Sequence, residues 1–405
     1  MIYIHIPYCR SFCTYCGFYS ELAGYNCNGF EPFTKALCNE IKERYGEFGN
    51  EVNTLYLGGG TPSVLPLSAI RKIVSCLHDH GAKAFSEFTM EVNPDDIVRK
   101  GLDYVRGLAD LGVNRVSMGV QSFDASLLRW MNRRHGPDDA VRACEMLREG
   151  GIHNVSMDLI FGVGNAVNEC YTGTGVQDRW KFSLNKMLSL KPSHISAYQL
   201  SVEEGSTLES LYSSGRWSPS SEEESAREYE DLCEILKNAG YHHYEISNFA
   251  IPGFEAEHNS AYWRHIPYTG LGPGAHSFII SDGRYIRRWN NPRLSDYIDV
   301  MSGNSSVAGS VRCQDYSGLL SEADELDGKI FGMEILDEEQ IVLEKIMLSL
   351  RTDAGIGLSY LVSHISNDKL TSLLDKGLLV MTSDGNVRIP EDRFFVSDNI
   401  VSSLF

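Results

Sequence analysis

Basic residues are scarce in this chain of 405 residues, which has 36 Lys and Arg against 54 Asp and Glu and a formal net charge of −18. The acidic balance argues against a nucleic-acid partner held by a basic face. The sequence also lacks a run of about 20 apolar residues, so no membrane span is predicted. No basic segment followed by a long apolar one stands at the N-terminus, so we expect no signal peptide. Peripheral membrane contact and the oligomeric state stay open.

A disulfide framework is missing as well. Of the ten cysteines, seven are scattered without regular spacing and three form a tight group near the N-terminus. Scattered cysteines are typical of a protein kept in a reducing compartment, so a cytoplasmic location is expected. The hydrophobic content of 42% and the charged content of 22% are those of a globular protein, and the length suffices for two or three domains.

The first two thirds of the chain alternate strand-like and helix-like segments. Strands are predicted at 3–6, 53–57, 85–92, 114–119, 154–161 and 194–200, with helices between them, one of which covers 96–111. Repeated strand–helix units indicate a parallel sheet with helices packed against it. The pattern therefore predicts an α/β fold with a full or partial TIM-like (β/α) barrel over residues 1–240.

The remainder of the chain changes character twice. Residues 241–336 are expected to form an irregular extension that ends in a polar linker at 302–328. Residues 337–405 contain two helical patterns, at 337–351 and 367–376, a hairpin pattern around Asp384-Gly385-Asn386 and a last helical pattern at 392–404. Helix–helix–hairpin order is typical of a winged-helix-like α+β domain, here without the basic excess that DNA binding would need.

Three cysteines follow the first predicted strand directly, in the spacing C-x3-C-x2-C: Cys9, Cys13 and Cys16. Thiolates favour iron–sulfur clusters or zinc. Three local thiolates without a fourth suit a [4Fe–4S] cluster that leaves one iron open to a small molecule. Zinc is the alternative, but a structural zinc site would need a fourth ligand in tetrahedral geometry. The spacing therefore predicts a metal centre with chemical capacity.

Other polar or glycine-rich motifs stand at the ends of predicted strands. The run GGGT at 58–61 ends the second strand, Glu91 ends the third, Gln121 follows the fourth, and Asp158 lies within the fifth. The carboxyl ends of parallel strands meet at one edge of a barrel, so we expect these residues to share a site. Glycine lets a ligand approach the backbone, and a buried carboxylate needs a ligand or a basic partner.

Together these motifs resemble the radical S-adenosylmethionine (SAM) superfamily, and the resemblance runs nearly end to end. More narrowly, the chain resembles the branch of the oxygen-independent coproporphyrinogen oxidases and the haem chaperones within it. The resemblance implies that the three cysteines hold three irons and that SAM binds the fourth. It assigns cofactor-binding roles to Tyr3, Tyr15, Gly59, Gly60, Thr61, Glu91, Gln121, Arg133 and Asp158.

Individual roles follow from the same resemblance. Glu91 is expected to accept a hydrogen bond from the SAM amino group, and Arg133 is expected to pair with the SAM carboxylate. Asp158 is expected to contact the ribose hydroxyls. Arg134 is the alternative to Arg133, because the two arginines are adjacent. Tyr15 matches an aromatic position near the adenine.

A further motif, His258-Asn259-x2-Tyr262-Trp263, matches one that the resemblance links with haem binding. Imidazole can ligate haem iron, and Tyr and Trp offer flat apolar faces. The alternative is an aromatic cluster packed against the barrel around a hydrogen-bonded histidine. If the first interpretation holds, haem is a third cofactor and acceptor haemoproteins are the partners.

The chain departs from the family pattern in two places that bear on function. Relatives follow the Asp158 strand with Gly-Leu-Pro-Gly-Gln, whereas this chain reads Gly-Val-Gly-Asn, so the loop at 163–179 is expected to be reshaped. In the true oxidases of the branch, the resemblance implies the motif C-x3-C-x2-C-x-C, whereas this chain has Phe18 at the last position. The N-terminal extension expected of those oxidases is also missing here. Phe18 and the missing extension favour a haem chaperone over a coproporphyrinogen III oxidase or a radical SAM enzyme with another substrate. They leave open whether the protein is an enzyme.

Overall fold

The protein is described by a computed structural model that covers residues 1–24, 29–48, 52–166, 176–303 and 331–405. Its centre is a nine-stranded sheet in the order β11-β1-β4-β5-β6-β7-β8-β10-β9. The parallel strands are β1 (Ile2–Ile6), β4 (Thr54–Gly59), β5 (Glu87–Val92), β6 (Arg115–Gln121), β7 (Asn154–Phe161), β8 (His194–Gln199) and β11 (Thr269–Leu271). The described strands β11 and β9 form its two edges, so the sheet is a partial barrel.

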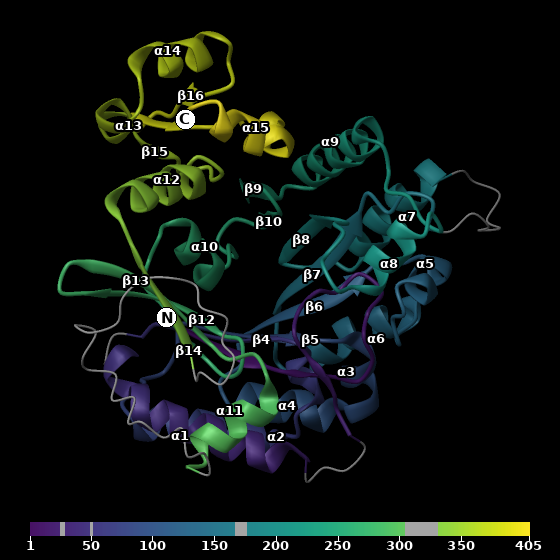
Figure 1. Cartoon of the computed structure of the whole chain (residues 1–405). Coiled ribbons are helices and arrows are strands. Elements are labelled where there is room, and N and C mark those ends of the chain that lie inside the picture. The colour runs from purple at the N-terminus through teal and green to yellow at the C-terminus, as the bar shows by residue number, and fades with distance from the viewer. Residues whose placement is uncertain (25–28, 49–51, 167–175, 304–330) are drawn as a thin grey trace.

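Helices cover the outer face of this sheet (Figure 1). They are α1 (Phe30–Phe48), α2 (Leu67–Asp79), α3 (Pro94–Lys100), α4 (Leu102–Asp110), α6 (Pro137–Glu149) and α7 (Val176–Ser189). Short elements lie between them: β2 (Tyr8–Cys9), β3 (Glu21–Leu22), η2 (Pro62–Val64) and α5 (Ala125–Trp130). After α7 come the short α8 (Thr207–Ser213) and the longer α9 (Glu222–Asn238). The helix expected at 96–111 is two helices, because Gly101 adopts a φ of 80° between them.

The two faces of each parallel strand differ in chemistry. Side chains on the outer face, such as Ile4, Leu57 and Met118, are fully buried in the apolar core under the helices. Alternate residues point into the barrel and are polar, as Ser117 on β6 and Asp158 on β7 illustrate. Strands alternate side chains with a period of two, so one face can pack while the other builds a site.

The segment expected to be irregular after residue 240 contains regular elements instead. β9 (His242–Glu245) and β10 (Asn248–Ala250) extend the sheet antiparallel beyond β8, and β11 joins it parallel to β1. A second, antiparallel sheet comprises β12 (His276–Ser281), β13 (Arg284–Asn290) and β14 (Phe331–Leu336). Helices α10 (Glu257–Trp263) and α11 (Leu294–Met301) complete the segment. Most of the linker expected at 302–328 lies outside the described residues; the division at 240 and 336 stays a proposal, although the sheet extends past residue 240.

The C-terminal unit stands at the far end of the molecule from α1 and α2 (Figure 1). It comprises α12 (Glu338–Ser349), β15 (Ile356–Gly357), α13 (Leu358–His364), α14 (Asn367–Asp375), β16 (Val380–Met381), β17 (Asn386–Arg388), η4 (Glu391–Val396) and α15 (Ser397–Ser402). Its small antiparallel sheet has the order β15-β17-β16, and α13 is a helix that the sequence pattern did not predict. The expected last helix is a 3₁₀ turn followed by α15.

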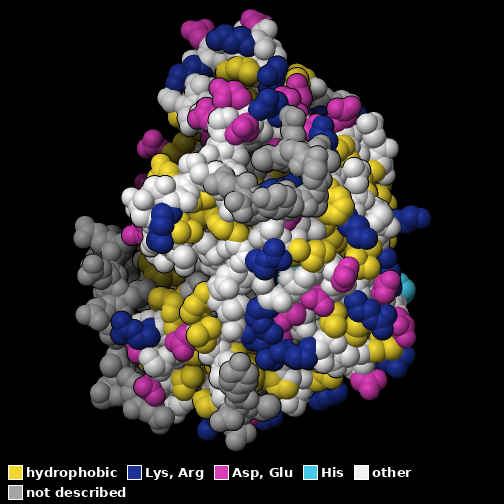
Figure 2. Space-filling model, turned by 90° about the vertical axis from the view of Figure 1, so that its right-hand side faces the viewer, with side chains coloured by type: hydrophobic (Ala, Val, Ile, Leu, Met, Phe, Trp, Pro, Cys, Tyr) yellow, Lys and Arg dark blue, Asp and Glu magenta, His cyan; other side chains and the backbone are white. Residues whose placement is uncertain are grey.

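The surface and the helices of the described chain can be compared with the expectations from composition. On the face shown in Figure 2, Lys and Arg side chains are interspersed with Asp and Glu rather than gathered into one basic patch. None of the helices in the described ranges is both long enough and apolar enough to cross a membrane.

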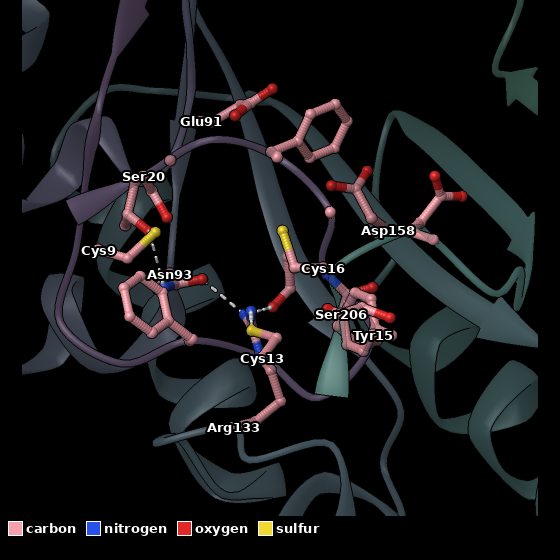
Figure 3. A pocket seen from close by; sticks show the side chains of 18 of the residues that line it. Cys9, Cys13, Tyr15, Cys16, Ser20, Glu91, Asn93, Arg133, Asp158 and Ser206 are labelled. Atoms are coloured by element: carbon pink, nitrogen blue, oxygen red, sulfur yellow. Dashed lines mark hydrogen bonds between the residues drawn. The ribbon is translucent and has the colours of Figure 1, made fainter. Parts of the chain in front are cut away.

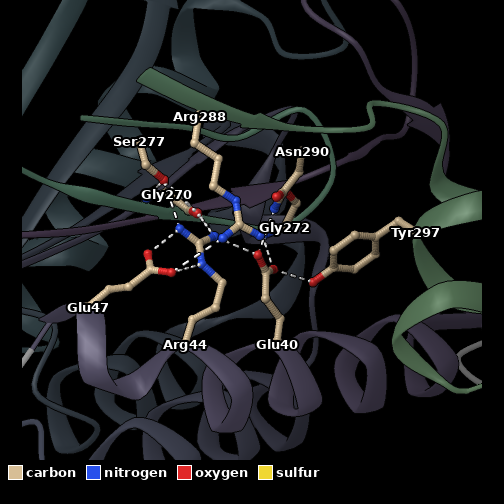
Figure 4. A network of polar contacts seen from close by, with 9 residues as sticks. All are labelled: Glu40, Arg44, Glu47, Gly270, Gly272, Ser277, Arg288, Asn290 and Tyr297. Atoms are coloured by element: carbon tan, nitrogen blue, oxygen red, sulfur yellow. Dashed lines mark hydrogen bonds and ion pairs between the residues drawn. The ribbon is translucent and has the colours of Figure 1, made fainter. Parts of the chain in front are cut away.

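A buried polar network fastens the second sheet to α1 (Figure 4). Arg44 donates to Glu40 Oε1 at 2.8 Å, to Glu47 Oε2 at 2.6 Å and to the carbonyl of Gly270 at 2.7 Å. The second sheet joins this pair through Ser277 on β12, whose hydroxyl accepts from Arg44 at 3.0 Å, and through Asn290 on β13, whose amide donates to Glu40 at 2.7 Å. Glu40 also accepts from the Tyr297 hydroxyl at 2.7 Å. Glu40 and Arg44 are buried, so each depends on the other and on these donors to offset the loss of water.

We expect Glu40→Ala to lower the free energy of unfolding by about 3 kcal/mol, because it leaves a buried guanidinium with one carboxylate fewer. Denaturant titration of the full chain measures the change. Glu31→Ala, which removes the exposed Lys72–Glu31 pair, is the matched control and should cost less than about 0.5 kcal/mol. Equal effects of the two variants would show that the buried network does not hold the second sheet.

Candidate functional site

A cavity of about 1050 Å³ opens at the carboxyl ends of the parallel strands. Most of the residues singled out from the sequence line it: Cys9, Cys13, Tyr15, Cys16, Gly59, Gly60, Thr61, Glu91, Gln121, Arg133 and Asp158. Figure 3 shows the three thiols facing the same space, with Glu91 and Asp158 around it. The parallel topology thus brings together residues from the ends of β1, β4, β5, β6 and β7, and Arg133 joins them from the segment after α5.

The cysteine loop is positioned by contacts with two distant segments. The backbone nitrogen of Thr14 donates to the carbonyl of Met131 at 3.1 Å, and its hydroxyl donates to the carbonyl of Trp130 at 2.7 Å. Asn132 donates to the carbonyl of Phe12 at 2.7 Å, and Leu208 donates to the carbonyl of Thr14 at 2.8 Å. The loop therefore has a defined path set by protein contacts alone.

The three thiols have polar neighbours, but they do not converge on one point where a single metal ion could bind all of them. Cys9 Sγ lies 3.3 Å from the Thr61 hydroxyl, and Arg133 Nη1 lies 3.4 Å from Cys13 Sγ. Burial raises the pKa of Cys9, and it raises the pKa of Cys16 to about 11. Within the described ranges, no three His, Cys, Asp or Glu side chains could hold one metal ion directly. A four-iron cluster makes a different demand, because each thiolate binds its own iron.

Two carboxylates stand inside the cavity with raised pKa values. Burial raises the pKa of Glu91 to about 7, and the charge of Asp158 adds to the rise. Glu91 accepts from the Tyr56 hydroxyl at 2.9 Å and from the backbone nitrogen of Gly59 at 3.2 Å. Burial raises the pKa of Asp158 to about 6, against hydrogen bonds from Ser196 and Ser117. A ligand that brings positive charge or hydrogen-bond donors would stabilise the ionised form of both carboxylates.

The two adjacent arginines have different surroundings. Arg133 reaches the Cys13 thiol and donates through Nη2 to Asn93 Oδ1 at 2.5 Å and to the carbonyl of Gly119 at 2.6 Å. Its Nε is buried and has no hydrogen-bond partner among the described residues. Arg134 is instead paired with Asp95 at 2.6 Å. An orphaned guanidinium N–H beside the thiols suits a carboxylate ligand, which favours Arg133 over Arg134.

Gln121 reaches the cavity through an irregular strand end. The pairing of β6 with β7 shifts register between Gly119 and Gln121, and Gln121 adopts a φ of 66°. A non-glycine residue in the left-handed region costs free energy and is frequent at functional sites. Gln121 lines the cavity at this irregular strand end.

The remaining sequence candidates lie elsewhere. Tyr3 is one layer below the cavity, with its hydroxyl 3.1 Å from His5 Nδ1 and its ring packed against Tyr56. His258 is fully buried at the amino end of the barrel, where its Nδ1 lies 2.8 Å from the Thr54 hydroxyl and its Nε2 lies 2.9 Å from the Tyr262 hydroxyl. These contacts are the ones expected if the motif forms an aromatic cluster packed against the barrel around a hydrogen-bonded histidine. Asn259, Tyr262 and Trp263 share α10 with His258 and do not line the cavity.

Sequence reasoning missed several residues that line the cavity. Asn93 bridges the two halves of the thiol site, since it accepts from Arg133 and its Nδ2 lies 3.4 Å from the Thr61 hydroxyl. Its position before Pro94 restricts its backbone to the extended region, which carries no information on its partner Arg133. Ser117 and Tyr56 face inward two residues from a strand-end glycine, as the period of two would have predicted. Part of the loop expected to be reshaped, 167–175, lies outside the described residues.

The fold and the site together define a radical SAM protein. The family model described as the radical SAM superfamily matches residues 3–170. The solved structure of coproporphyrinogen III oxidase (HemN) from Escherichia coli, a radical SAM enzyme, superposes with a TM-score of 0.75 at 21% identity and covers 100% of this chain and 89% of that one. At that identity the likeness shows the fold alone.

Curated relatives narrow the assignment. The heme chaperone HemW of Synechocystis is 32% identical over 98% of this chain and 87% of its own length. The heme chaperone HemW of Bacillus subtilis is 34% identical over 87% of this chain and 84% of its own length. The chain therefore belongs to the radical SAM superfamily, in its HemN-like branch, and is HemW-like. Membership implies a [4Fe–4S] cluster and SAM, and the thiols, the carboxylates and the orphaned Arg133 Nε fit them.

Titration of Glu91 generates a prediction for the ligand-free protein. Its pKa is about 7 when folded against an ordinary value of 4.5, so the folded state binds the proton more tightly. The resulting stability is present below pH 4.5 and is lost as pH rises through 7. Relative to Glu91→Gln, wild type should lose about 2 kcal/mol of unfolding free energy between about pH 5 and about pH 8. Thermal and denaturant unfolding at both pH values measure this loss, with Glu223→Gln on the exposed face of α9 as control. A constant difference across this range would contradict the raised pKa.

The Asn93–Arg133 contact generates a second prediction. Asn93→Asp places a permanent carboxylate beside Arg133, where it competes with the SAM carboxylate, whereas Asn93→Ala only loosens the guanidinium. We expect SAM to bind the cluster-loaded Asp variant at least about tenfold more weakly than wild type, and the Ala variant to lie between them. Equilibrium dialysis measures the affinities, with Arg134→Gln as the control that should stay near wild type. Unchanged SAM binding by Asn93→Asp would remove Arg133 from the SAM site.

Proposed function

We propose that this protein is a cytoplasmic haem chaperone, which binds a [4Fe–4S] cluster, SAM and haem and passes haem to acceptor haemoproteins. The observation that carries the proposal is Phe18. Phe18 occupies the position at which the resemblance implies a further cysteine in the oxidases of the branch. It lines the cavity, and 74% of its surface is exposed. The names of the relatives at 32% and 34% identity support the same conclusion.

The cavity suits a flat apolar ligand beside SAM. Phe12 also lines it and is 48% exposed, so Phe12 and Phe18 form an aromatic mouth to the cavity. Tyr198 is 45% exposed and lines the cavity near Asp158 and Glu91. Exposed aromatic clusters mark ligand or partner sites, and aromatic faces stack well on planar ring systems. The volume of about 1050 Å³ lies at the upper end of the roughly 300–1000 Å³ usual for one ligand, which leaves room for a second molecule.

The residues of the site have separable tasks under this proposal. Cys9, Cys13 and Cys16 would hold three irons, Glu91 and Arg133 would bind the amino and carboxylate groups of SAM, and Asp158 would bind its ribose. When bound, the cluster and SAM supply the capacity to generate a 5′-deoxyadenosyl radical. The protein's own contribution is orientation, and burial in the cavity limits access of water.

His258 enters this proposal as a structural residue rather than as the haem ligand. Both of its ring nitrogens are engaged, and burial lowers its pKa to about 3. Glu87 accepts from the backbone nitrogens of Glu257 and His258 at 2.7 and 3.1 Å and fixes the start of α10. Iron ligation by His258 would require α10 to leave the barrel, so we place haem at the aromatic mouth instead.

The test uses anaerobically reconstituted, cluster-loaded protein. We expect haem to remain bound through gel filtration with a Soret band, and Phe18→Ser with Phe12→Ser to weaken haem binding at least about tenfold. Phe182→Ser on α7, 55% exposed and outside the cavity lining, is the matched control and should bind as wild type does.

Two results would overturn the proposal or its haem site. Formation of protoporphyrinogen from coproporphyrinogen III, SAM and a reductant, at a rate that sustains turnover, would establish the oxidase instead. Loss of haem in a folded His258→Ala variant, with the Phe18 variant unaffected, would return haem to α10.

A further inference from the structure

Two thiols meet between α1 and α2, on the outer side of the barrel and away from the cavity lining. Cys38 lies in the middle of α1, and Cys76 lies near the end of α2. The Cys76 thiol donates to the carbonyl oxygen of Cys38 at 3.5 Å, and Cys38 Sγ lies 3.9 Å from the carbonyl oxygen of Lys72. Figure 1 shows the two helices side by side at the base of the molecule.

The two thiols differ in access and in charge environment. Cys38 is half-buried, and the neighbouring Cys76 thiol, with smaller contributions from Lys42 and Lys72, lowers its pKa. Cys76 is buried, and the neighbouring Cys38 thiol together with burial raises its pKa. His80 is close by, with Nδ1 3.9 Å from Cys76 Sγ, but that nitrogen lies 2.8 Å from the carbonyl of Cys76.

This asymmetry is that of an attacking and a resolving cysteine. Redox-sensitive thiols are partly accessible, have a lowered pKa and lie beside a second thiol. Cys144 on α6 shows the contrast, because it is 1% exposed and burial raises its pKa.

We propose that Cys38 and Cys76 are an oxidisable pair that closes a reversible disulfide between α1 and α2. With a peroxide as oxidant, the Cys38 thiolate attacks one peroxide oxygen, the O–O bond breaks, and Cys38 becomes a sulfenic acid as hydroxide leaves. The hydroxide of the first step takes up the Cys76 proton and becomes water. The Cys76 thiolate then attacks the Cys38 sulfur, the S–S bond forms, and the S–O bond breaks as hydroxide leaves. The pair loses two electrons in total, and the peroxide gains them.

The bond would secure the wall of the cavity without entering it. The chain between the two cysteines contains β4 and residues 59–61, in which Gly59 donates to Glu91 and Thr61 contacts Cys9. Under oxidising conditions that damage an open cluster, the disulfide would join α1 and α2, which flank this segment. A crosslink across such a loop stabilises a protein mainly by restricting its unfolded chain.

The experiment treats the cluster-loaded full chain with hydrogen peroxide and maps cysteine peptides without reduction. We expect a Cys38–Cys76 linked peptide that dithiothreitol removes, and a thermal midpoint about 5 °C higher in the oxidised protein. Cys38→Ser should abolish both effects, and Cys144→Ser should leave both unchanged. In Cys76→Ser the reaction should stop at Cys38 sulfenic acid, which dimedone labels.

Three outcomes would overturn the proposal. The first is complete alkylation of Cys38 and Cys76 after treatment, and the second is a linked peptide that joins Cys38 mainly to another cysteine. The third is a Cys76→Ser protein without dimedone label at Cys38. None of these readouts depends on haem, so the result is independent of the proposed function.

Discussion

The inward-facing side chains of the parallel strands are polar, and each of them must find a partner inside a barrel whose outer face is sealed by apolar packing. An unpaired polar group in such an interior costs free energy. At the amino end His258 has such partners in Thr54 and Tyr262, although the buried Arg115 Nε at the start of β6 has none among the described residues. At the carboxyl end Arg133 Nε likewise lacks a partner among the described residues, and Glu91 has a pKa near 7. Arg133 and Glu91 line the cavity, so the carboxyl end is the end that suits a ligand.

The cysteine loop follows from the same arrangement. It leaves β1 at the open end and is fastened to the segment after α5 and to the start of α8 through Thr14. Arg133 then joins the loop to the strand ends, because it contacts Cys13, Asn93 and the carbonyl of Gly119 at once. A site assembled in this way holds its thiols by contacts from three separate parts of the chain. Its geometry therefore depends on the fold as a whole rather than on the local C-x3-C-x2-C spacing.

Most of the barrel and the thiol site could be predicted from sequence, since strand periodicity and strand-end motifs are local signals. Long-range pairing is not local, and so β11 beside β1 and β9 with β10 at the other edge were taken for irregular chain. The motif around His258 shows that local spacing has the same limit. The same spacing of His, Tyr and Trp suits a haem site and a helix packed against the end of a barrel. Asn93 was missed because its importance arises from Arg133, forty residues away in sequence and 2.5 Å away in space.

Radical chemistry and haem transport make different demands on one cavity. A radical enzyme has to place its substrate against SAM and shield both from solvent, whereas a carrier has to release its cargo to another protein. Exposed Phe12 and Phe18 serve the second demand better, because aromatic side chains at an open mouth can be shared with an acceptor surface. The interior with Glu91, Arg133 and Asp158 is common to both activities. Under the proposed function, the rim of the cavity separates the two activities, because Phe18 is exposed there at the position where the resemblance implies a cysteine in the oxidases.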